Sequence, residues 1–354
     1  MVETAWLSHC RGSMPPCFPP PRCYVIAEAG SNHDGHVDQA LRLIDVAADA
    51  GADAVKFQVF RAQALYAQGA GSSDYLGDPR SIRDIIAALQ VPPDWLPLLA
   101  AHAAERRIDF LASAFDEESV DLIDPFVAAH KCASYEMTHH PLVAHMARKG
   151  KTLIMSTGTA DLPEVAEAVS VVRATADVPL VLLQCTASYP TPLADLNLRA
   201  MRTMAGAFGV PVGLSDHSRH PTIGPAAAVA LGACVIEKHF TLSNDLPGPD
   251  HRFALEPRQL VEMVAAIRGT EEALGSGEKT SAPVEQELRR FARRAVFTVR
   301  PIARGEELTT ENLAVLRCGK MAAGLPPSMF DSLLGQRAAR DLPVDHPLAA
   351  DDLG

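Results

Sequence analysis

The sequence predicts an α/β protein: one closed, parallel (β/α)8 TIM barrel followed by a small C-terminal β-rich domain. The chain has 354 residues, which is enough for one large domain and a small one. Its composition is 47% hydrophobic but only 5% aromatic, which suits layers of aliphatic side chains. Eight β-rich runs each precede a segment of helical periodicity, and eight units of about 30 residues match a barrel of about 250 residues.

Each expected strand ends at or beside polar residues. The strands are Tyr24–Glu28, Ala54–Phe57, Asp109–Ala112, Lys131–Ser134, Thr152–Ser156, Leu180–Cys185, Val212–Ser215 and Val235–His239. Helical periodicity follows them, for example over Asp38–Ala50 and Leu162–Ala174. An open doubly wound sheet is the alternative, but it gives no reason for so many polar strand ends. The glycine-rich dinucleotide fingerprint is also missing after the first strand, where Gly30 stands alone.

Composition shifts predict four segments. Residues 1–22 are proline-rich, contain no apolar core of a signal peptide, and are expected to be a disordered extension. Residues 23–275 form the barrel, and residues 276–294 form a polar, charged linker. Residues 295–354 form a small mixed module with apolar pieces at Val296–Val299 and Leu313–Leu316. No internal repeat is expected beyond the β-α alternation.

Charge and cysteine usage narrow the classes of partner. The net charge is −11, from 32 basic and 43 acidic residues, and no basic patch offsets it, so nucleic acid and anionic membranes are not expected partners. No apolar run approaches the roughly 20 residues of a membrane-spanning helix. The seven cysteines form no C-x-x-C pair, which predicts reduced thiols and a cytoplasmic location.

The polar strand ends predict an anion site, because the active site of this fold lies at the C-terminal ends of the strands. Lys56 and Lys131 lie inside apolar strands, where each needs an anionic partner. A ligand with a phosphate and a carboxylate would need both lysines. Four serines at strand ends could donate hydroxyl hydrogen bonds to the phosphate, although a single strand-end serine is more often a helix cap. They are Ser113, Ser134, Ser156 and Ser215.

His217 and His239 end neighbouring strands, so both imidazoles can face one point over the barrel mouth. Two histidines with water and a substrate oxygen suit a divalent cation that acts as a Lewis acid. The alternative is a pair of neutral, hydrogen-bonded histidines. The adjoining Asp216 and Glu237 are expected to be hydrogen-bond partners or members of salt bridges.

The loop after the eighth strand is stiffened by two prolines and projects Asp250 over the mouth. A rigidly held carboxylate suits recognition of hydroxyl groups on a polyol, although an ordinary Pro-Gly turn is the simpler interpretation. Four other loop histidines are expected to bind substrate or nothing. They are His33, His139, His140 and His251.

Taken together, these motifs resemble the sialic acid synthase family, whose members condense phosphoenolpyruvate with N-acetylmannosamine or related sugars. The matching segments are IAEAGSNH (26–33), VKFQ (55–58), STG (156–158), CT (185–186), YPTP (189–192), GLSDH (213–217), EKHFT (237–241) and GPDH (248–251). The tail, with Ile302, Gly305-Glu306, Asn312-Leu313 and Leu334-Gly335, resembles the antifreeze-like (SAF) domain that follows the barrel in this family.

The resemblance implies a role for each matching position. Phosphoenolpyruvate is held by Lys56, Ser113, Lys131, Ser134, Ser156 and Ser215. The acceptor sugar contacts Gln58, Glu136, Tyr189, His239 and Asp250. A Mn²⁺ or Mg²⁺ ion is bound by His217 and His239, and Glu28 lies close to the reacting centre. The family also implies a domain-swapped homodimer in which Arg317 enters the partner's site.

The implied reaction condenses phosphoenolpyruvate, water and an N-acetylmannosamine-like sugar into a nine-carbon 2-keto acid, with release of phosphate. Residues 133–136 (ASYE) look more like the pseudaminic and legionaminic branches, whose acceptor is a 2,4-diacetamido-trideoxy hexose, and Ala187 replaces an asparagine that is frequent in the family. Two other classes remain open. One is a phosphoenolpyruvate barrel for a phosphorylated aldose, and the other is a carbohydrate-binding protein without turnover.

Overall fold

The computed structural model describes residues 22–72 and 79–354. The predicted disordered extension, residues 1–22, lies outside the described residues except for Arg22. The chain divides into two compact units, residues 1–275 and 276–354. None of the helices in the described part of the chain is long and apolar enough to span a membrane.

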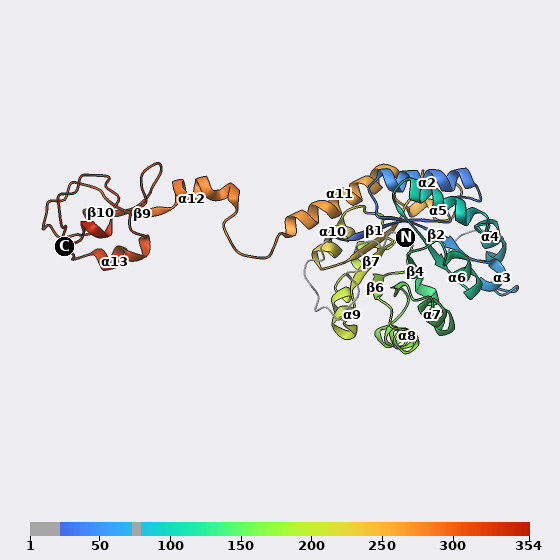
Figure 1. The fold of residues 1–354 in the computed structure, drawn as a ribbon. Helices are drawn as coiled ribbons and strands as arrows, with labels where there is room; N and C mark the ends of the chain where they lie inside the picture. The colour runs from blue at the N-terminus through green and yellow to red at the C-terminus, as the bar shows by residue number, and fades with distance from the viewer. Residues whose placement is uncertain (1–21, 73–78) are drawn as a thin grey trace. The chain divides into compact units, whose positions relative to one another are not determined.

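The first unit is a closed barrel whose eight parallel strands follow one another in chain order, as predicted. Figure 1 shows these strands inside a ring of helices. The strands are β1 (Tyr24–Gly30), β2 (Ala54–Val59), β3 (Asp109–Ala114), β4 (Ala129–Cys132), β5 (Thr152–Ser156), β6 (Leu180–Cys185), β7 (Val212–Asp216) and β8 (Val235–His239). Almost every strand residue is buried, because the barrel interior covers one face of each strand and the helices cover the other.

Some helices of the barrel unit begin at side-chain caps. Asp161 and Glu164 form a capping box at the start of α8, and the Asp116 carboxylate accepts a hydrogen bond from the Ser119 amide in α6. The helices are α2 (Val37–Asp49), α3 (Ala62–Leu65), α4 (Ile82–Ala88), α5 (Trp95–Glu105), α6 (Glu117–Ile123), α7 (His140–Arg148), α8 (Leu162–Thr175), α9 (Ala200–Phe208), α10 (Ile223–Ala230) and α11 (Pro257–Leu274).

Strand β4 differs from the prediction. It was expected over Lys131–Ser134, but it covers Ala129–Cys132. Ser134 instead begins a 3-10 turn, η1 (Ser134–Glu136), which turns the chain away from the barrel wall. The register of β5 with β4 places Lys131 beside Ile154, one layer below the mouth. The shift therefore leaves Lys131 inside the barrel and moves Ser134 onto the loop above it.

The amino-terminal end of the barrel carries a network of charged and polar groups, here called the base network. The Asp53 carboxylate accepts hydrogen bonds from the Val25 amide at 2.8 Å and the Arg268 guanidinium at 2.6 Å. The Tyr24 hydroxyl donates to the Asp109 carboxylate at 2.6 Å. These bonds tie β1, β2, β3 and α11 together where the barrel closes.

The second unit is small and mixed, as expected from the sequence. Two antiparallel strands, β9 (Arg294–Thr298) and β10 (Leu313–Arg317), form its sheet. The predicted linker contains η4 (Pro283–Glu285) and α12 (Gln286–Ala292), and the rest of the unit contains η5 (Pro327–Met329), α13 (Phe330–Leu333) and η6 (Ala350–Asp352). The unit has its own apolar core, which includes Val296, Ile302, Leu308 and Leu348.

The prediction of no further internal repeat is wrong for this unit, because residues forty positions apart occupy equivalent places. Ile302 and Leu342 pair with each other, each amide donating to the other's carbonyl at 2.9 and 2.8 Å. Gly305 and Asp345 both have positive φ, of 81° and 59°. The same spacing relates identical residues in the sequence, namely Arg300 and Arg340, Leu308 and Leu348, and Leu313 and Leu353.

Candidate functional site

Two lysines and two glutamates meet inside the mouth of the barrel. Lys56 on β2 lies 2.6 Å from a Glu28 carboxylate oxygen on β1 and donates to the Ser113 hydroxyl on β3 at 2.9 Å. Glu237 on β8 lies 3.9 Å from the Lys56 ammonium and 3.7 Å from that of Lys131 on β4. All four charged side chains are at least nine-tenths buried, so each lysine depends on a carboxylate in this state.

The hydroxyl groups of the predicted serines line the same cluster. Ser156 accepts a hydrogen bond from the Lys131 ammonium at 2.7 Å, and Ser215 donates to Glu237 at 3.1 Å. Ser134 lies higher, where its hydroxyl oxygen accepts from the Gly158 amide at 3.0 Å. A Cβ at Gly158 would lie 2.9 Å from that oxygen, so the turn after β5 needs glycine there.

The two glutamates differ in their affinity for protons. Burial raises the pKa of Glu28 to about 7, although Lys56 opposes the shift. Burial also acts on Glu237, but Lys131 and Lys56 outweigh it and hold the pKa of that carboxyl below its usual range. Glu237 is therefore the fixed anion between the lysines, whereas Glu28 can accept and release a proton near neutral pH.

His217 and His239 lie side by side above this cluster, with ring centroids 5.5 Å apart. The His217 Nδ1 lies 3.0 Å from the Thr186 carbonyl oxygen, which can only accept, so Nδ1 carries the proton and Nε2 presents a lone pair. The His239 Nδ1 is buried without a hydrogen-bond partner. Burial, followed by the nearby His217, lowers the pKa of His239 well below its usual value, so its ring is neutral.

Two neighbouring imidazoles fit a divalent cation that keeps open coordination positions. Burial lowers the pKa of His217, but Cys185 and the Thr186 carbonyl outweigh burial and raise it, so a cation would displace a proton from that ring. No cluster of three or more histidine, cysteine or carboxylate side chains that could hold a metal occurs in residues 22–72 and 79–354. The chain itself therefore offers two ligands, and water or substrate oxygens would supply the others.

One side of the mouth is lined by aromatic and acidic groups. Tyr189 packs on His217 with ring centroids 4.1 Å apart, and Phe253 lies 5.2 Å from His239. A Cβ at Gly30, whose φ is +56°, would lie 3.4 Å from an Asp250 carboxylate oxygen, 3.5 Å from one of Glu28 and 3.6 Å from the His239 ring. Asp250, Glu28 and His239 therefore converge on one point above β1.

Glu136 and Gln58 complete the predicted set in the barrel. Burial raises the pKa of Glu136 to about 7, and its Oε2 atom is buried without a hydrogen-bond partner. Gln58 is half-buried at the end of β2, beside Ser113 on β3. Gln58 lies near the end of β2, whereas Glu136 lies in η1, the turn that follows β4.

Three of the predicted loop histidines are not brought into this cluster, and one predicted residue belongs to the second unit. Arg317 is exposed at the end of β10 in the second unit. His33 is fully buried, and burial lowers the pKa of His33 to about 4. Its ring packs edge-on against Trp95 at 5.6 Å, so it is a neutral core residue. His139 and His140 begin α7.

The sequence did not indicate that Glu237 lies between the two lysines of the cluster, and it assigned no definite role to His251. Glu237 was expected to partner a histidine or form a salt bridge; it forms the salt bridges, with Lys56 and Lys131. The available signal was its spacing of two from His239, which puts both side chains on the inner face of β8. Asp216 instead faces outward and pairs with Lys238 at 2.8 Å.

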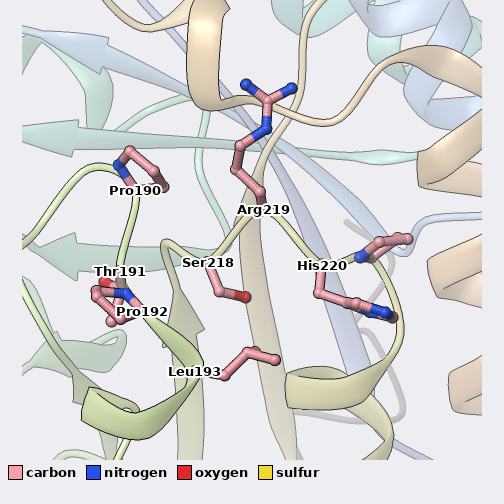
Figure 2. Close-up of a pocket in the computed structure, with 8 residues that line it drawn as sticks. Pro190, Thr191, Pro192, Leu193, Ser218, Arg219 and His220 are labelled. Carbon is pink, nitrogen blue, oxygen red and sulfur yellow. The ribbon is translucent and has the colours of Figure 1, made fainter.

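Figure 2 shows a surface pocket of about 460 Å³ beside the loop that carries Tyr189. Its walls are residues 190–193, after β6, and residues 218–221, after β7. Arg219 at its rim donates hydrogen bonds to the Arg252 carbonyl and to Asn244 in the loop after β8. None of the predicted site residues lines this pocket, so it is separate from the charged cluster.

Comparisons with known proteins agree with this geometry. The sequence profile of the NeuB family matches residues 43–279, and that of the SAF domain matches residues 293–354. The chain is 43% identical to the spore coat polysaccharide biosynthesis protein SpsE of Bacillus subtilis, over 93% of each chain. It is 39% identical to the N,N'-diacetyllegionaminic acid synthase of Legionella pneumophila, over 90% of this chain and 91% of that one.

The fold is shared with a solved member of the same group. The crystal structure of Bacillus subtilis SpsE matches 94% of this chain and 95% of that one, with a TM-score of 0.63 and 42% identity. The profile covers most of the barrel, and these full-length relatives extend through both units. The chain therefore belongs to the NeuB family, with a C-terminal SAF domain.

Proposed function

We propose that this protein condenses phosphoenolpyruvate with an amino sugar and water to form a nine-carbon 2-keto acid, releasing phosphate. The observation that carries the proposal is the buried cluster of two lysines, two glutamates and hydroxyl groups at the barrel mouth. A ligand with both a carboxylate and a phosphate matches two separate ammonium groups, each already hydrogen-bonded to a serine.

In this proposal Lys56 and Lys131 bind the anionic groups of phosphoenolpyruvate and hold it with its C3 atom toward the acceptor aldehyde. C3 attacks the aldehyde carbon, whose oxygen takes up a proton and becomes a hydroxyl group, and water adds to the cationic C2. The C2 hydroxyl then loses its proton as the C2–O bond to phosphate breaks, which leaves the 2-keto group and inorganic phosphate. Glu28 takes the proton from that water, because its pKa of about 7 suits a base near neutral pH. Glu237 stays ionised and keeps both lysines oriented.

The acceptor lies against Tyr189 and Phe253, with Asp250 and Glu136 accepting hydrogen bonds from its hydroxyl or amide groups. A divalent cation held by His217 and His239, Mn²⁺ or Mg²⁺, would supply Lewis-acid polarisation of the acceptor carbonyl. His217 keeps its Nδ1 proton on the Thr186 carbonyl, which fixes the orientation of the ring toward the mouth.

Phosphate release from phosphoenolpyruvate, measured with a panel of 2-acetamido sugars, tests the reaction. We expect release that requires an acceptor and that chelation of divalent ions abolishes. Binding of phosphoenolpyruvate without release for any acceptor would instead support a binding protein without turnover. Release that is unaffected by chelation would remove the two-histidine ion site.

The same panel decides between two acceptors. N-acetylmannosamine is one, and a 2,4-diacetamido-trideoxy hexose is the other. The 39% identity to a legionaminic acid synthase supports the second, as does the ASYE segment at residues 133–136. We expect the ratio kcat/KM to favour the diacetamido sugar, and a higher value for N-acetylmannosamine would reverse the assignment.

We also propose that the protein acts as a homodimer in which Arg317 reaches the partner's site. Mixing two inactive variants, Arg317→Ala and Glu28→Gln, tests this. In a mixed dimer one site receives an intact glutamate from its own barrel and an intact arginine from the partner, so activity should return. No recovery after subunit exchange would show that Arg317 acts within its own chain or not at all.

A further inference from the structure

The segment between β8 and α11, residues 240–256, forms a loop with a closed neck. Phe240 and Leu255 pair as a parallel bridge, the Thr241 amide donates to the Leu255 carbonyl at 2.8 Å, and the Leu255 amide donates to the His239 carbonyl at 2.9 Å. Asp250 lies near the middle of this loop and takes no part in the backbone hydrogen bonds of the neck. The neck alone therefore does not determine where the Asp250 carboxylate points.

His251 holds the middle of the loop. Its side chain is fully buried, with Nδ1 2.6 Å from the Thr241 hydroxyl and Nε2 3.0 Å from both carboxylate oxygens of Asp34. Because a carboxylate only accepts, Nε2 carries the proton and donates it to Asp34. The Asn244 side chain also donates to the His251 carbonyl at 2.6 Å. Residue 251 is thus fixed by contacts on opposite sides of its ring and through its backbone.

Asp34 belongs to the loop after β1 and is itself held in place. It has a φ of 51°, and its Oδ2 accepts a hydrogen bond from the Gln39 side chain in α2 at 2.7 Å. Gln39 also donates to the Asn32 carbonyl at 2.8 Å. The carboxylate is therefore anchored to the barrel wall, so it can serve as a fixed point for a loop that lies 217 residues further along the chain.

Gly248 shows how closely the two loops approach. A Cβ at this position would lie 2.4 Å from an Asp34 carboxylate oxygen and 2.8 Å from the His251 ring. Its φ lies outside the left-handed region, so the backbone itself would accept alanine. The need for glycine here comes from the contact between Asp34 and His251.

We infer that Asp34 and His251 are positioning residues that hold the Asp250 carboxylate at the acceptor side of the barrel mouth. Asp250 directly precedes His251, so fixing the imidazole fixes the backbone from which the Asp250 side chain projects toward Gly30 and His239. Neither Asp34 nor His251 needs to contact the substrate. The inference rests on the proposed function, in which Asp250 binds the acceptor sugar.

Four variants test the pair. Asp34→Ala removes the fixed point, and Gly248→Ala pushes Asp34 and His251 apart without deleting either group. Asp34→Asn keeps an oxygen that accepts the His251 proton. The matched control is Asp245→Asn, which makes the same change of charge at an exposed position of the same loop. Each variant is assayed for the KM of the acceptor, the KM of phosphoenolpyruvate, kcat and thermal unfolding.

We expect Asp34→Ala and Gly248→Ala to raise the KM of the acceptor about tenfold or more, the scale of one lost hydrogen bond to a charged group. The KM of phosphoenolpyruvate should change less than about twofold, since the lysine cluster is untouched. Asp34→Asn should restore most of the acceptor affinity, and Asp245→Asn should match wild type. Equal rises in both KM values, or a loss of folded protein with both KM values unchanged, would overturn the inference.

Hydrogen exchange separates this inference from the proposed function. Amides of residues 244–252 should exchange faster in Asp34→Ala and Gly248→Ala than in wild type and Asp245→Asn. Unchanged exchange overturns the positioning role whatever the activity. A wild-type protein that releases no phosphate with any acceptor, while these exchange differences hold, refutes the proposed function and leaves the loop anchor supported.

Discussion

The two ends of the barrel both carry paired charges, but their surroundings differ. At the base, Asp53 accepts hydrogen bonds from the Val25 amide and the Arg268 guanidinium, and no polar atom of the base network is buried without a partner. At the mouth, the Glu237 Oε2, Glu136 Oε2 and His239 Nδ1 atoms are all buried without hydrogen-bond partners. The Asp53 and Arg268 side chains are 17% and 23% exposed, so water also reaches the base, whereas the Lys56 and Glu237 side chains at the mouth are only 3% and 7% exposed.

The difference indicates what each end is for. A buried charge whose partners are all supplied by the protein stabilises the closed barrel or at least costs nothing further. Buried groups without partners cost stability until something else satisfies them. The base network defined above is complete as folded, whereas the mouth keeps buried atoms that the proposed ligand would satisfy. Stability and activity should therefore respond to substitutions at opposite ends of the same strands.

The largest expected effect is on turnover at the mouth. Glu28→Gln keeps the shape of the side chain but removes the base, so kcat should fall about 10²- to 10⁴-fold while phosphoenolpyruvate still binds. Phosphate release and equilibrium binding measure the two properties. The control is Glu271→Gln in α11 at the base, which should keep wild-type kcat. Near-normal turnover in Glu28→Gln would reject its role as the base.

The next effect is on stability at the base. Asp53→Ala removes the acceptor of the Val25 amide and one of the two carboxylate partners of the Arg268 guanidinium, and we expect the free energy of unfolding to fall by about 3 kcal/mol. Urea unfolding measures this change, and kcat/KM of the remaining folded protein should not change. If Asp53→Ala instead lost activity while its stability stayed the same, the assignment of stability to the base and activity to the mouth would be wrong.

Ligand binding should stabilise the mouth by a similar amount. At 100 times its Kd, phosphoenolpyruvate should raise the free energy of unfolding by about 2.7 kcal/mol, seen as a higher Tm. Asp53→Ala should show the same increase from a lower starting value. Lys131→Met should show none, because one of the two ammonium groups is gone. A full increase in Lys131→Met would place the phosphoenolpyruvate site elsewhere.

The smallest effect concerns the pH dependence of stability. As pH rises, the contribution of a carboxyl group at the mouth should be lost, and that of one at the base should be gained. The pKa of Glu136 at the mouth is raised by burial from 4.5 to about 7, so its contribution to stability is complete below pH 4.5 and is lost as pH rises through 7. Glu136→Gln should therefore gain about 2 kcal/mol relative to wild type between pH 5 and pH 8.

Asp124, which precedes β4 at the base, is the carboxyl group to compare with Glu136, because its pKa shifts in the opposite direction. Burial raises its pKa, but Lys151 and His130 outweigh burial and hold the pKa below 3.8. Its contribution is present above pH 3.8 and is lost as pH falls through the lowered value. Asp124→Asn should be less stable than wild type at neutral pH, and the gap should close in acid. Parallel pH profiles for the two variants would contradict this assignment.

Sequence patterns predicted the barrel well because its strands are short apolar runs with polar ends. The limits of β5, β6 and β8 were predicted to the residue, since each run stops where a polar group meets the mouth. The position of β4 was wrong because Ser134 and Glu136 favour a turn whose start depends on the Gly158 contact. That contact joins loops far apart in the chain, so no local pattern contains it.

The candidate site was predicted to a similar extent. Strand spacing and family motifs placed Glu28, Lys56 and Lys131 near one another, and the structure does bring them together. The anchor formed by Asp34 and His251 was missed because both residues lie in loops, and the GPDH segment that contains His251 does not indicate a partner for it. Their contact becomes visible only when the barrel closes and brings β1 beside β8.

The two equivalent segments of the SAF domain, forty residues apart, close the same turn with side chains of different charge. The Asn312 side-chain oxygen accepts a hydrogen bond from the Thr309 amide, whereas the Asp352 carboxylate accepts one from the Ala349 amide. Burial opposes ionisation of Asp352, but the Ala349 amide, His346 and Arg340 together lower its pKa. This particular turn therefore responds to acid in the second copy, whereas the neutral Asn312 amide in the first copy does not titrate.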